Sequence, residues 1–194
     1  LRNFLFYGGK EAIGCSAMLS GTGMCLSRSV VNKHGWSAFS VAEDWEFSVS
    51  LLLNDVVIHF NPLARVFARE SKGLKQASRQ RLRWATGKYA VMTNGARRLF
   101  LQGVSRGKAN LIDGAVTLAA PNYSSQASMT LFALVCSLFL SQEPAWGFLL
   151  PWSLAVLGSL GGYFLLGAMH TQSPLKTLAG IPYIAVFLPW RLSI

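Results

Sequence analysis

The chain has 194 residues, of which 52% are hydrophobic and 13% charged, and its formal net charge is +10. An average soluble domain carries about 25% charged residues, so this composition excludes a disordered segment, a polar linker and a coiled coil. A chain that is both apolar and basic is either a membrane protein or an unusually apolar protein that binds polyanions.

The first predicted strand leads into a glycine turn. The apolar run Ala17–Leu19 is typical of a strand end, and Gly21, Thr22 and Gly23 come shortly after it. Glycine adopts positive φ and allows a backbone to approach a ligand closely. The same pattern also forms ordinary turns, so these residues alone leave both interpretations open.

An acidic pair opens the next predicted helix, which follows an aromatic loop over residues 36–41. The helix is predicted from Ala42 to Leu53 and begins with Glu43 and Asp44. Negative side chains suit this place because the helix dipole and the free N–H groups of the first turn are positive. Four apolar residues then share one face of the helix: Trp45, Val49, Leu52 and Leu53. On these grounds the acidic pair is equally consistent with a helix cap and with a site.

Two more strands are predicted, over Val56–Phe60 and over Ala64–Ala68. In the first of them His59 alternates with apolar neighbours, which is the pattern of a packed histidine rather than a ligand. Strands that alternate with helices predict an α/β domain.

A long helix is predicted from Gly73 to about Thr93, and it carries the sequence Gln80-Arg81-Leu82-Arg83-Trp84. Because positions i, i+3 and i+4 share one helix face, Gln80, Arg83 and Trp84 project together. A guanidinium beside an indole and an amide can hold a phosphate and stack on a ring. The alternative is a basic helix at a membrane, whose arginines meet anionic head groups.

Residues 65–108 form a basic block, with twelve basic residues and one acidic residue. Apart from the Gln80, Arg83 and Trp84 triplet, we expect seven of its cations to contact lipid head groups: Lys72, Lys75, Arg79, Arg97, Arg98, Arg106 and Lys108. Such a block could also bind nucleic acid. Because apolar segments follow it directly, we expect no nucleic-acid partner.

The last third of the chain is apolar. No charged residue occurs over 114–142 or over 144–175, and about 20 apolar residues suffice to cross a bilayer. A third apolar run, 177–190, is interrupted by two prolines. We therefore expect two to three transmembrane helices in residues 109–194, after a domain at residues 1–108. Buried helices of a soluble domain are the alternative.

The basic block also predicts the orientation of the chain. Segments rich in lysine and arginine beside a first span stay in the cytosol. We therefore expect a multi-pass protein of the plasma (inner) membrane with residues 1–108 in the cytosol.

The order of these motifs resembles the back half of a membrane-integrated family-2 glycosyltransferase of the cellulose-synthase and hyaluronan-synthase type. The resemblance rests on the glycine turn, the acidic pair, the Gln-X-X-Arg-Trp sequence and the apolar segments, and it extends to about residue 140. Ala42 stands where such enzymes more often have threonine. The resemblance implies the C-terminal half of a nucleotide-sugar-binding domain of the glycosyltransferase A type, followed by transmembrane helices.

The resemblance also implies roles for eight residues. Asp44 would be the general base that deprotonates the acceptor hydroxyl, and Glu43 would flank it. Arg83 would face the diphosphate of the donor. The remaining residues would line the acceptor side: Gly21, Thr22, Gly23, Gln80 and Trp84. The implied reaction is an inverting transfer from a nucleotide-sugar, a UDP-sugar in the first instance, to a growing polysaccharide or glycan.

The resemblance implies a divalent cation, Mg²⁺ or Mn²⁺, held by an Asp-X-Asp motif. No such motif occurs in this chain, and its three cysteines lack the paired spacing of a metal site. We therefore expect the metal ligands and the nucleotide pocket in a preceding half of the domain, and an inactive fragment without it. The competing hypothesis is a non-catalytic membrane scaffold or part of a transporter, in which Asp44 and Trp84 would tolerate replacement.

Overall fold

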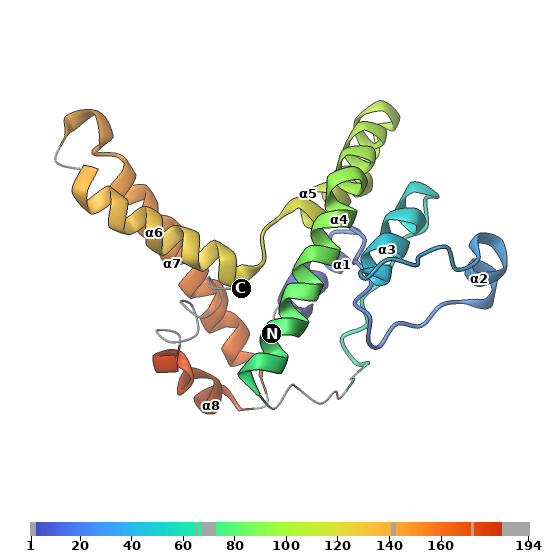
Figure 1. Cartoon of the computed structure of the whole chain (residues 1–194), viewed down its shortest axis with the longest axis horizontal. Helices are drawn as coiled ribbons and strands as arrows, with labels where there is room; N and C mark the ends of the chain where they lie inside the picture. Colours follow the sequence, from blue (N-terminus) through green and yellow to red (C-terminus); the bar gives the residue numbers. More distant parts are fainter. Residues whose placement is uncertain (1–2, 65, 67–72, 141–142, 172, 184–194) are drawn as a thin grey trace. The chain divides into compact units, whose positions relative to one another are not determined.

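A computed structural model describes residues 3–64, 66, 73–140, 143–171 and 173–183 of the chain (Figure 1). Its contacts divide the chain into two compact units, one over Asn3–Ala120 and the other formed mainly by residues from Pro121 onward. Each unit is described by itself below. The helix over residues 109–119, with which the predicted membrane region begins, packs within the first unit; the domain boundary stays a prediction.

The first unit consists of short and long helices joined by extended segments (Figure 1). In chain order they are the π-helical turn η1 (Asn3–Tyr7), α1 (Gly8–Ala12), α2 (Arg28–His34), α3 (Glu43–Leu53), α4 (Leu74–Arg106) and α5 (Ala109–Ala119). The helix predicted over residues 42–53 is confirmed as α3. The helix predicted to end near residue 93 continues to Arg106.

Helices α4 and α5 form a closely packed hairpin. Gly107 ends α4 in the left-handed conformation, with φ +62°, so that the chain reverses into α5. Opposite the turn, a Cβ added to Gly103 would lie 2.7 Å from Cγ1 of Ile112. The absent side chain therefore lets the two helix backbones approach each other.

Helix α3 is buried between two apolar clusters. Val49 and Leu52 pack in the larger cluster, which includes Leu99 of α4 and Leu118 of α5. On its other side, α3 contributes to a smaller cluster made of Leu19, Ala38, Phe47 and Leu51. This burial on two sides fixes the direction of α3, and with it the place of the acidic residues at its first turn.

The described residues contain no β-strand, so the predicted α/β class is not confirmed for this chain. Two of the predicted strands are extended and lie side by side, joined by a bond of 2.8 Å from the Ala17 N–H to the Ile58 carbonyl. The neighbouring donors bind side chains instead of a strand. The Ser16 N–H donates to Asn110 Oδ1 and the Ile58 N–H donates to Ser16 Oγ. Most of the predicted strand at 64–68 lies outside the described residues.

His59 does not pack as predicted. Its side chain is 73% exposed, and its Nδ1 lies 2.8 Å from Oε1 of Glu11. The other oxygen of that carboxylate accepts the Phe60 N–H at 3.0 Å. These bonds lower the pKa of Glu11, the histidine contact being the stronger cause. His59 is thus held at the surface by a carboxylate of α1, a contact that the alternation of polar and apolar residues does not predict.

The second unit is built on a hairpin of two apolar helices, α6 (Tyr123–Leu140) and α7 (Leu149–Met169) (Figure 1). The Tyr123 hydroxyl donates to the Leu160 carbonyl at 2.8 Å, and its ring lies 5.9 Å from that of Tyr163. By length and composition both helices are able to cross a membrane, and only 11% and 6% of their most apolar windows are buried. Shorter helical turns complete the unit: η2 (Pro144–Trp146), α8 (Pro174–Leu178) and η3 (Ile181–Tyr183). The remainder of the third predicted span lies beyond the described residues.

A buried cation joins α1 to α5. Lys10 is 6% exposed, and its Nζ lies 2.6 Å from Oδ2 of Asp113 and 2.7 Å from Oγ1 of Thr117. A buried ammonium is tolerated only when it is paired and hydrogen-bonded. The Asp113 oxygen, which has no other partner among the described residues, is satisfied by this ion pair.

We expect Lys10→Met to lower the free energy of unfolding by about 2–3 kcal/mol, because it leaves a largely desolvated carboxylate without its partner. Denaturation of the detergent-solubilised protein, followed by circular dichroism, measures this change. Lys33→Met, at an exposed position of α2, is the matched control and should leave the stability within about 0.5 kcal/mol. Equal stabilities of the two variants would contradict the assignment.

Candidate active site

The acidic pair lies at the N-terminus of α3. The helix begins at Glu43, and no side chain caps it; three acidic residues, Glu43, Asp44 and Glu46, occupy its first turn. Glu43 and Asp44 are both half-buried. Their charge suits the positive end of the helix dipole, as predicted from the sequence.

The structure brings the glycine turn and the acidic pair together. The Gly21 N–H donates to Oδ2 of Asp44 at 2.8 Å, and the other carboxylate oxygen accepts the Trp45 N–H at the same distance. Gly21 has a positive φ of +21°, and a Cβ on it would lie 3.5 Å from Oδ2. A carboxylate oxygen has two lone pairs, so each oxygen of Asp44 keeps capacity for a further hydrogen bond.

The rest of the turn is exposed and lies close to the segment that leads toward α4. Thr22 and Gly23 are both exposed, and the Thr22 N–H donates to the Ser20 carbonyl. A Cβ added to Gly23, whose φ is +76°, would lie 2.5 Å from Cγ2 of Val66. Any other residue at position 23 would displace this segment.

Helix α4, which carries the Gln-X-X-Arg-Trp sequence, crosses the N-terminus of α3. A Cβ added to Gly87 would lie 3.1 Å from the Cβ of Ala42, and Nζ of Lys88 lies 5.1 Å from the centre of the Trp45 ring. Lys88 Nζ also donates to the Ala120 carbonyl at 2.7 Å. The Gln-X-X-Arg-Trp sequence thus begins on the turns of α4 that precede this crossing.

The three residues of that motif differ in exposure. Trp84 is 50% exposed and Arg83 is exposed, whereas Gln80 is half-buried. Among the contacts of the described residues, none joins Arg83 or Trp84 to Asp44. The structure therefore places the Gln-X-X-Arg-Trp sequence on the helix that crosses the first turn of α3, and only the glycine turn is in direct contact with the acidic pair.

Sequence analysis missed the role of Glu46. Its Oε2 accepts the N–H groups of Phe39 and Ser40 at 3.1 and 3.0 Å, so the carboxylate holds the loop that precedes α3. The bond from the Ser40 backbone is the main reason why the pKa of Glu46 is lowered. Trp36 of the same loop packs against Phe47 with tilted rings, whose centres lie 4.7 Å apart. The available signal was a third acidic residue in the first helical turn.

Ser48 was also missed, because nothing in its spacing distinguishes it from other helical serines. It is 0% exposed. Its Oγ accepts the Leu19 N–H at 2.8 Å and donates to the Asp44 carbonyl at 2.7 Å. The segment before the glycine turn is thereby hydrogen-bonded to α3 one helical turn beyond Asp44.

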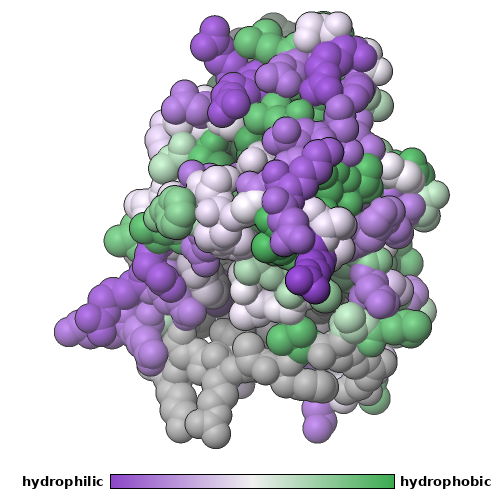
Figure 2. Space-filling model, turned by 90° about the vertical axis from the view of Figure 1, so that its right-hand side faces the viewer, coloured by the Kyte–Doolittle hydropathy of each residue, from purple (hydrophilic) through white to green (hydrophobic). Residues whose placement is uncertain are grey.

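The side of the molecule that carries α2 shows hydrophilic and hydrophobic side chains interleaved over its surface (Figure 2). Large apolar residues of α2 and of the loop that follows are exposed there, among them Phe39 at 85% and Val41 at 54%. This loop ends at Ala42, immediately before the acidic pair. Exposed apolar side chains therefore lie on the loop that Glu46 binds, which directly precedes the acidic pair in the sequence.

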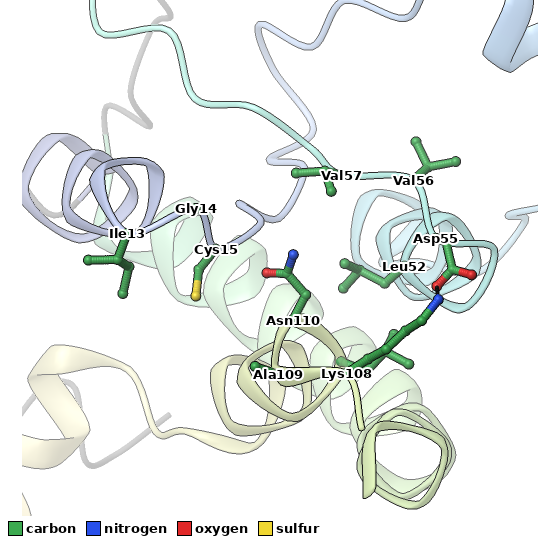
Figure 3. Close-up of a pocket in the computed structure, with 11 residues that line it drawn as sticks. Ile13, Gly14, Cys15, Leu52, Asp55, Val56, Val57, Lys108, Ala109 and Asn110 are labelled. Carbon is green, nitrogen blue, oxygen red and sulfur yellow. Dashed lines mark ion pairs between the residues drawn. The ribbon is translucent and has the colours of Figure 1, made fainter. Parts of the chain in front are cut away.

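A cavity of about 380 Å³ lies at the opposite end of α3 from Asp44 (Figure 3). Its walls come from residues 13–15, from the end of α3 with residues 55–57, and from the start of α5. In Figure 3 Lys108 reaches Asp55, with which it forms an ion pair of 2.6 Å. None of the residues predicted for the site lines this cavity, so we place the candidate site at the N-terminus of α3, where the glycine turn contacts the acidic pair.

Arg106 and Lys108, for which we expect lipid contacts, both pair with Asp55. Arg106 Nη2 lies 2.5 Å from Oδ2 of Asp55, and its Nη1 donates to the Leu53 carbonyl at 3.2 Å. The pKa of Asp55 is lowered, mainly by the hydrogen bond from Lys108. These basic residues fasten the end of α3 to the end of α4.

Within the described ranges, no three His, Cys, Asp or Glu side chains lie close enough together to hold a metal ion. The residues at the N-terminus of α3 therefore do not by themselves form a site for Mg²⁺ or Mn²⁺. A divalent cation remains an implication of the resemblance.

Comparison with known proteins agrees with the motifs. The family model described as Glycosyl transferase family group 2 matches residues 3–192. No curated protein and no solved structure matched the chain. Since the matched range covers nearly the whole sequence, the chain belongs to this family of glycosyltransferases.

We expect Gly87→Leu to separate α4 from the first turn of α3, because a side chain at residue 87 would meet Ala42. Overpacking of this kind costs about 1–3 kcal/mol, which thermal unfolding of the solubilised protein measures. Ala85→Leu adds a similar side chain at an exposed position of the same helix and serves as the control. A Gly87→Leu protein as stable as Ala85→Leu would show that the crossing is not close-packed.

The lowered pKa of Glu46 predicts a pH dependence of stability. A carboxyl group whose folded pKa lies below its unfolded value stabilises the protein above the unfolded pKa, near 4.5 here, and loses this contribution as the pH falls through the folded pKa. We expect wild type to be more stable than Glu46→Gln at neutral pH, with the difference shrinking as the pH falls below the unfolded pKa of 4.5. Thermal unfolding across this range measures it, and a difference that does not change with pH would contradict the assignment.

Proposed function

We propose that this chain is the acceptor-side half of an inverting glycosyltransferase that moves a sugar from a nucleotide-sugar, in the first instance a UDP-sugar, to a growing polysaccharide or glycan at a membrane. Membership of the family supports glycosyl transfer. The observation that carries the finer proposal is the hydrogen bond of 2.8 Å from the Gly21 N–H to Asp44. It joins two of the motifs at the first turn of a firmly packed helix.

In the proposed reaction Asp44 is the general base. It takes the proton from the acceptor hydroxyl while that oxygen forms a bond to the anomeric carbon and the bond from this carbon to the diphosphate breaks. Because attack and departure occur on opposite faces of the sugar, the configuration inverts. The amide of Gly21 orients the carboxylate, and Glu43 flanks it.

The remaining motif residues would bind the two substrates. We propose that the guanidinium of Arg83 faces the diphosphate, where charge develops as the bond breaks. Gln80 and Trp84 would contact the acceptor sugar, and so would Thr22 and Gly23 of the turn. The exposure of the Trp84 indole is in keeping with stacking on a sugar ring. A divalent cation, Mg²⁺ or Mn²⁺, would neutralise the diphosphate, with ligands that this chain does not supply.

The membrane setting is part of the same proposal. Helices α6 and α7 are long and apolar enough to span a bilayer and keep most of their surface exposed. The basic residues of α4 favour a cytosolic location for the first unit. We propose a multi-pass protein of the plasma (inner) membrane.

We also propose that the extended segments near Ala17 and Ile58 are strands of a complete α/β domain of the glycosyltransferase A type.

We expect Asp44→Asn to lower the rate of nucleotide release at least about 10²–10⁴-fold, the usual effect of general acid–base catalysis. The assay follows UDP release from a panel of UDP-sugars by membranes that contain the full-length protein, with Mg²⁺ or Mn²⁺. Asp55→Asn removes a carboxylate at the other end of α3 and should retain release, since asparagine also accepts the positive φ found there.

Three outcomes decide the proposal. Donor-dependent release that is lost only in Asp44→Asn supports it and identifies the sugar. Equal release from Asp44→Asn and wild type would reduce Asp44 to a helix cap. Absence of release from the wild-type protein with every donor and acceptor tried would favour the non-catalytic scaffold or transporter part.

A further inference from the structure

The segment before the glycine turn is attached to α3 at two points. The Leu19 N–H donates to Oγ of Ser48, and two residues later the Gly21 N–H donates to Oδ2 of Asp44, both at 2.8 Å. The two acceptors are four residues apart on the helix. Leu19 itself is buried in the smaller cluster, packed with Phe47 and Leu51.

The spacing of the two bonds follows from backbone geometry. Two residues of extended chain advance about 6.6 Å, and four residues of an α-helix advance about 6 Å. Alternate amides of an extended segment therefore meet acceptors one turn apart on a helix. A slip of one residue would bring the wrong amide to Asp44, so the register of the segment decides which N–H the carboxylate receives.

Ser48 sets this register. Its side chain is 0% exposed, and its hydroxyl is committed on both sides, as acceptor for Leu19 and as donor to the Asp44 carbonyl at 2.7 Å. A bond from a helical serine to the carbonyl four residues earlier is common. Acceptance of an amide from a segment 29 residues away is not part of that pattern.

We propose that Ser48 is a positioning residue for the transfer reaction, which holds the Gly21 amide against the carboxylate of Asp44. Ser48 contacts no substrate and acts only through the extended segment. The inference rests on the proposed function in so far as Asp44 is the base. It adds a buried residue to those that act in the proposed reaction, one helical turn after the acidic pair.

A positioning role differs from a merely structural one in what Ser48→Ala changes. The substitution leaves the Leu19 amide buried without its acceptor, so the segment loses its first attachment. Val49→Ala is the matched control, because Val49 is the next residue, is 6% exposed and packs in the other cluster. It weakens the packing of α3 without touching either hydrogen bond.

The first measurement is amide hydrogen exchange of residues 19–21 in the full-length protein. We expect the Leu19 and Gly21 amides of Ser48→Ala to exchange about tenfold faster or more than in wild type, which corresponds to the loss of one hydrogen bond. Val49→Ala should leave the Gly21 amide protected. Unchanged protection of Gly21 in Ser48→Ala would overturn the proposal.

The second measurement is steady-state kinetics of nucleotide release. We expect Ser48→Ala to lower kcat about tenfold or more while the KM for the donor stays within about twofold, because only the orientation of the base changes. Ser48→Thr, which keeps the hydroxyl, should recover part of the lost kcat. Equal losses of kcat in Ser48→Ala and Val49→Ala, at equal stability, would overturn the proposal.

The two measurements separate this inference from the function on which it rests. If wild type released no nucleotide, the proposed function would fail, and hydrogen exchange would still decide whether Ser48 docks the Gly21 amide onto Asp44. If wild type is active and Asp44→Asn is not, the kinetics of the Ser48 variants decide the inference directly.

Discussion

The burial of α3 on two sides is the constraint on which the rest of the first unit depends. Phe47 and Leu51 enter one apolar cluster while Val49 and Leu52 enter the other. Each such side chain contributes about 1.5–3 kcal/mol when it is fully buried, whereas a single hydrogen bond contributes about 0.5–1.5 kcal/mol. Packing therefore fixes the position of the helix, and the hydrogen bonds around its first turn orient the carboxylates that it carries. A base on a surface helix would lack this rigid support.

The sequence predicted α3 and a turn at the glycines, because both follow from local patterns: apolar periodicity, acidic residues at a helix start, and glycines after an apolar run. It did not predict the hydrogen bond that joins the first turn of α3 to the glycine turn. It did not predict the absence of strands among the described residues. The partners that replace strand pairing, such as Asn110 for the Ser16 amide, are far away in the chain. Long-range acceptors of this kind leave no periodic signal, and the same reason hid Ser48, whose hydroxyl accepts an amide 29 residues away. Glu46 was missed although the amides that it accepts lie only six and seven residues before it.

The three acidic residues of the first turn of α3 show how similar side chains acquire different tasks. Glu46 accepts two loop amides on its Oε2, and its charge serves the loop that precedes the helix. Asp44 receives one amide on each oxygen and keeps lone pairs for a further partner. Glu43, which precedes Asp44 in the same turn, is half-buried. Composition treats them as one acidic cluster, whereas the hydrogen bonds attach Glu46 to the preceding loop and Asp44 to the glycine turn.

Lys88 joins two places that the chain keeps far apart. Its ammonium lies over the Trp45 indole, next to Asp44, and at the same time holds the Ala120 carbonyl, the last one of the first unit. One flexible side chain thus connects the point where the chain leaves the first unit with the indole that follows Asp44, so a change at Ala120 would remove one of the two contacts that hold this ammonium in place.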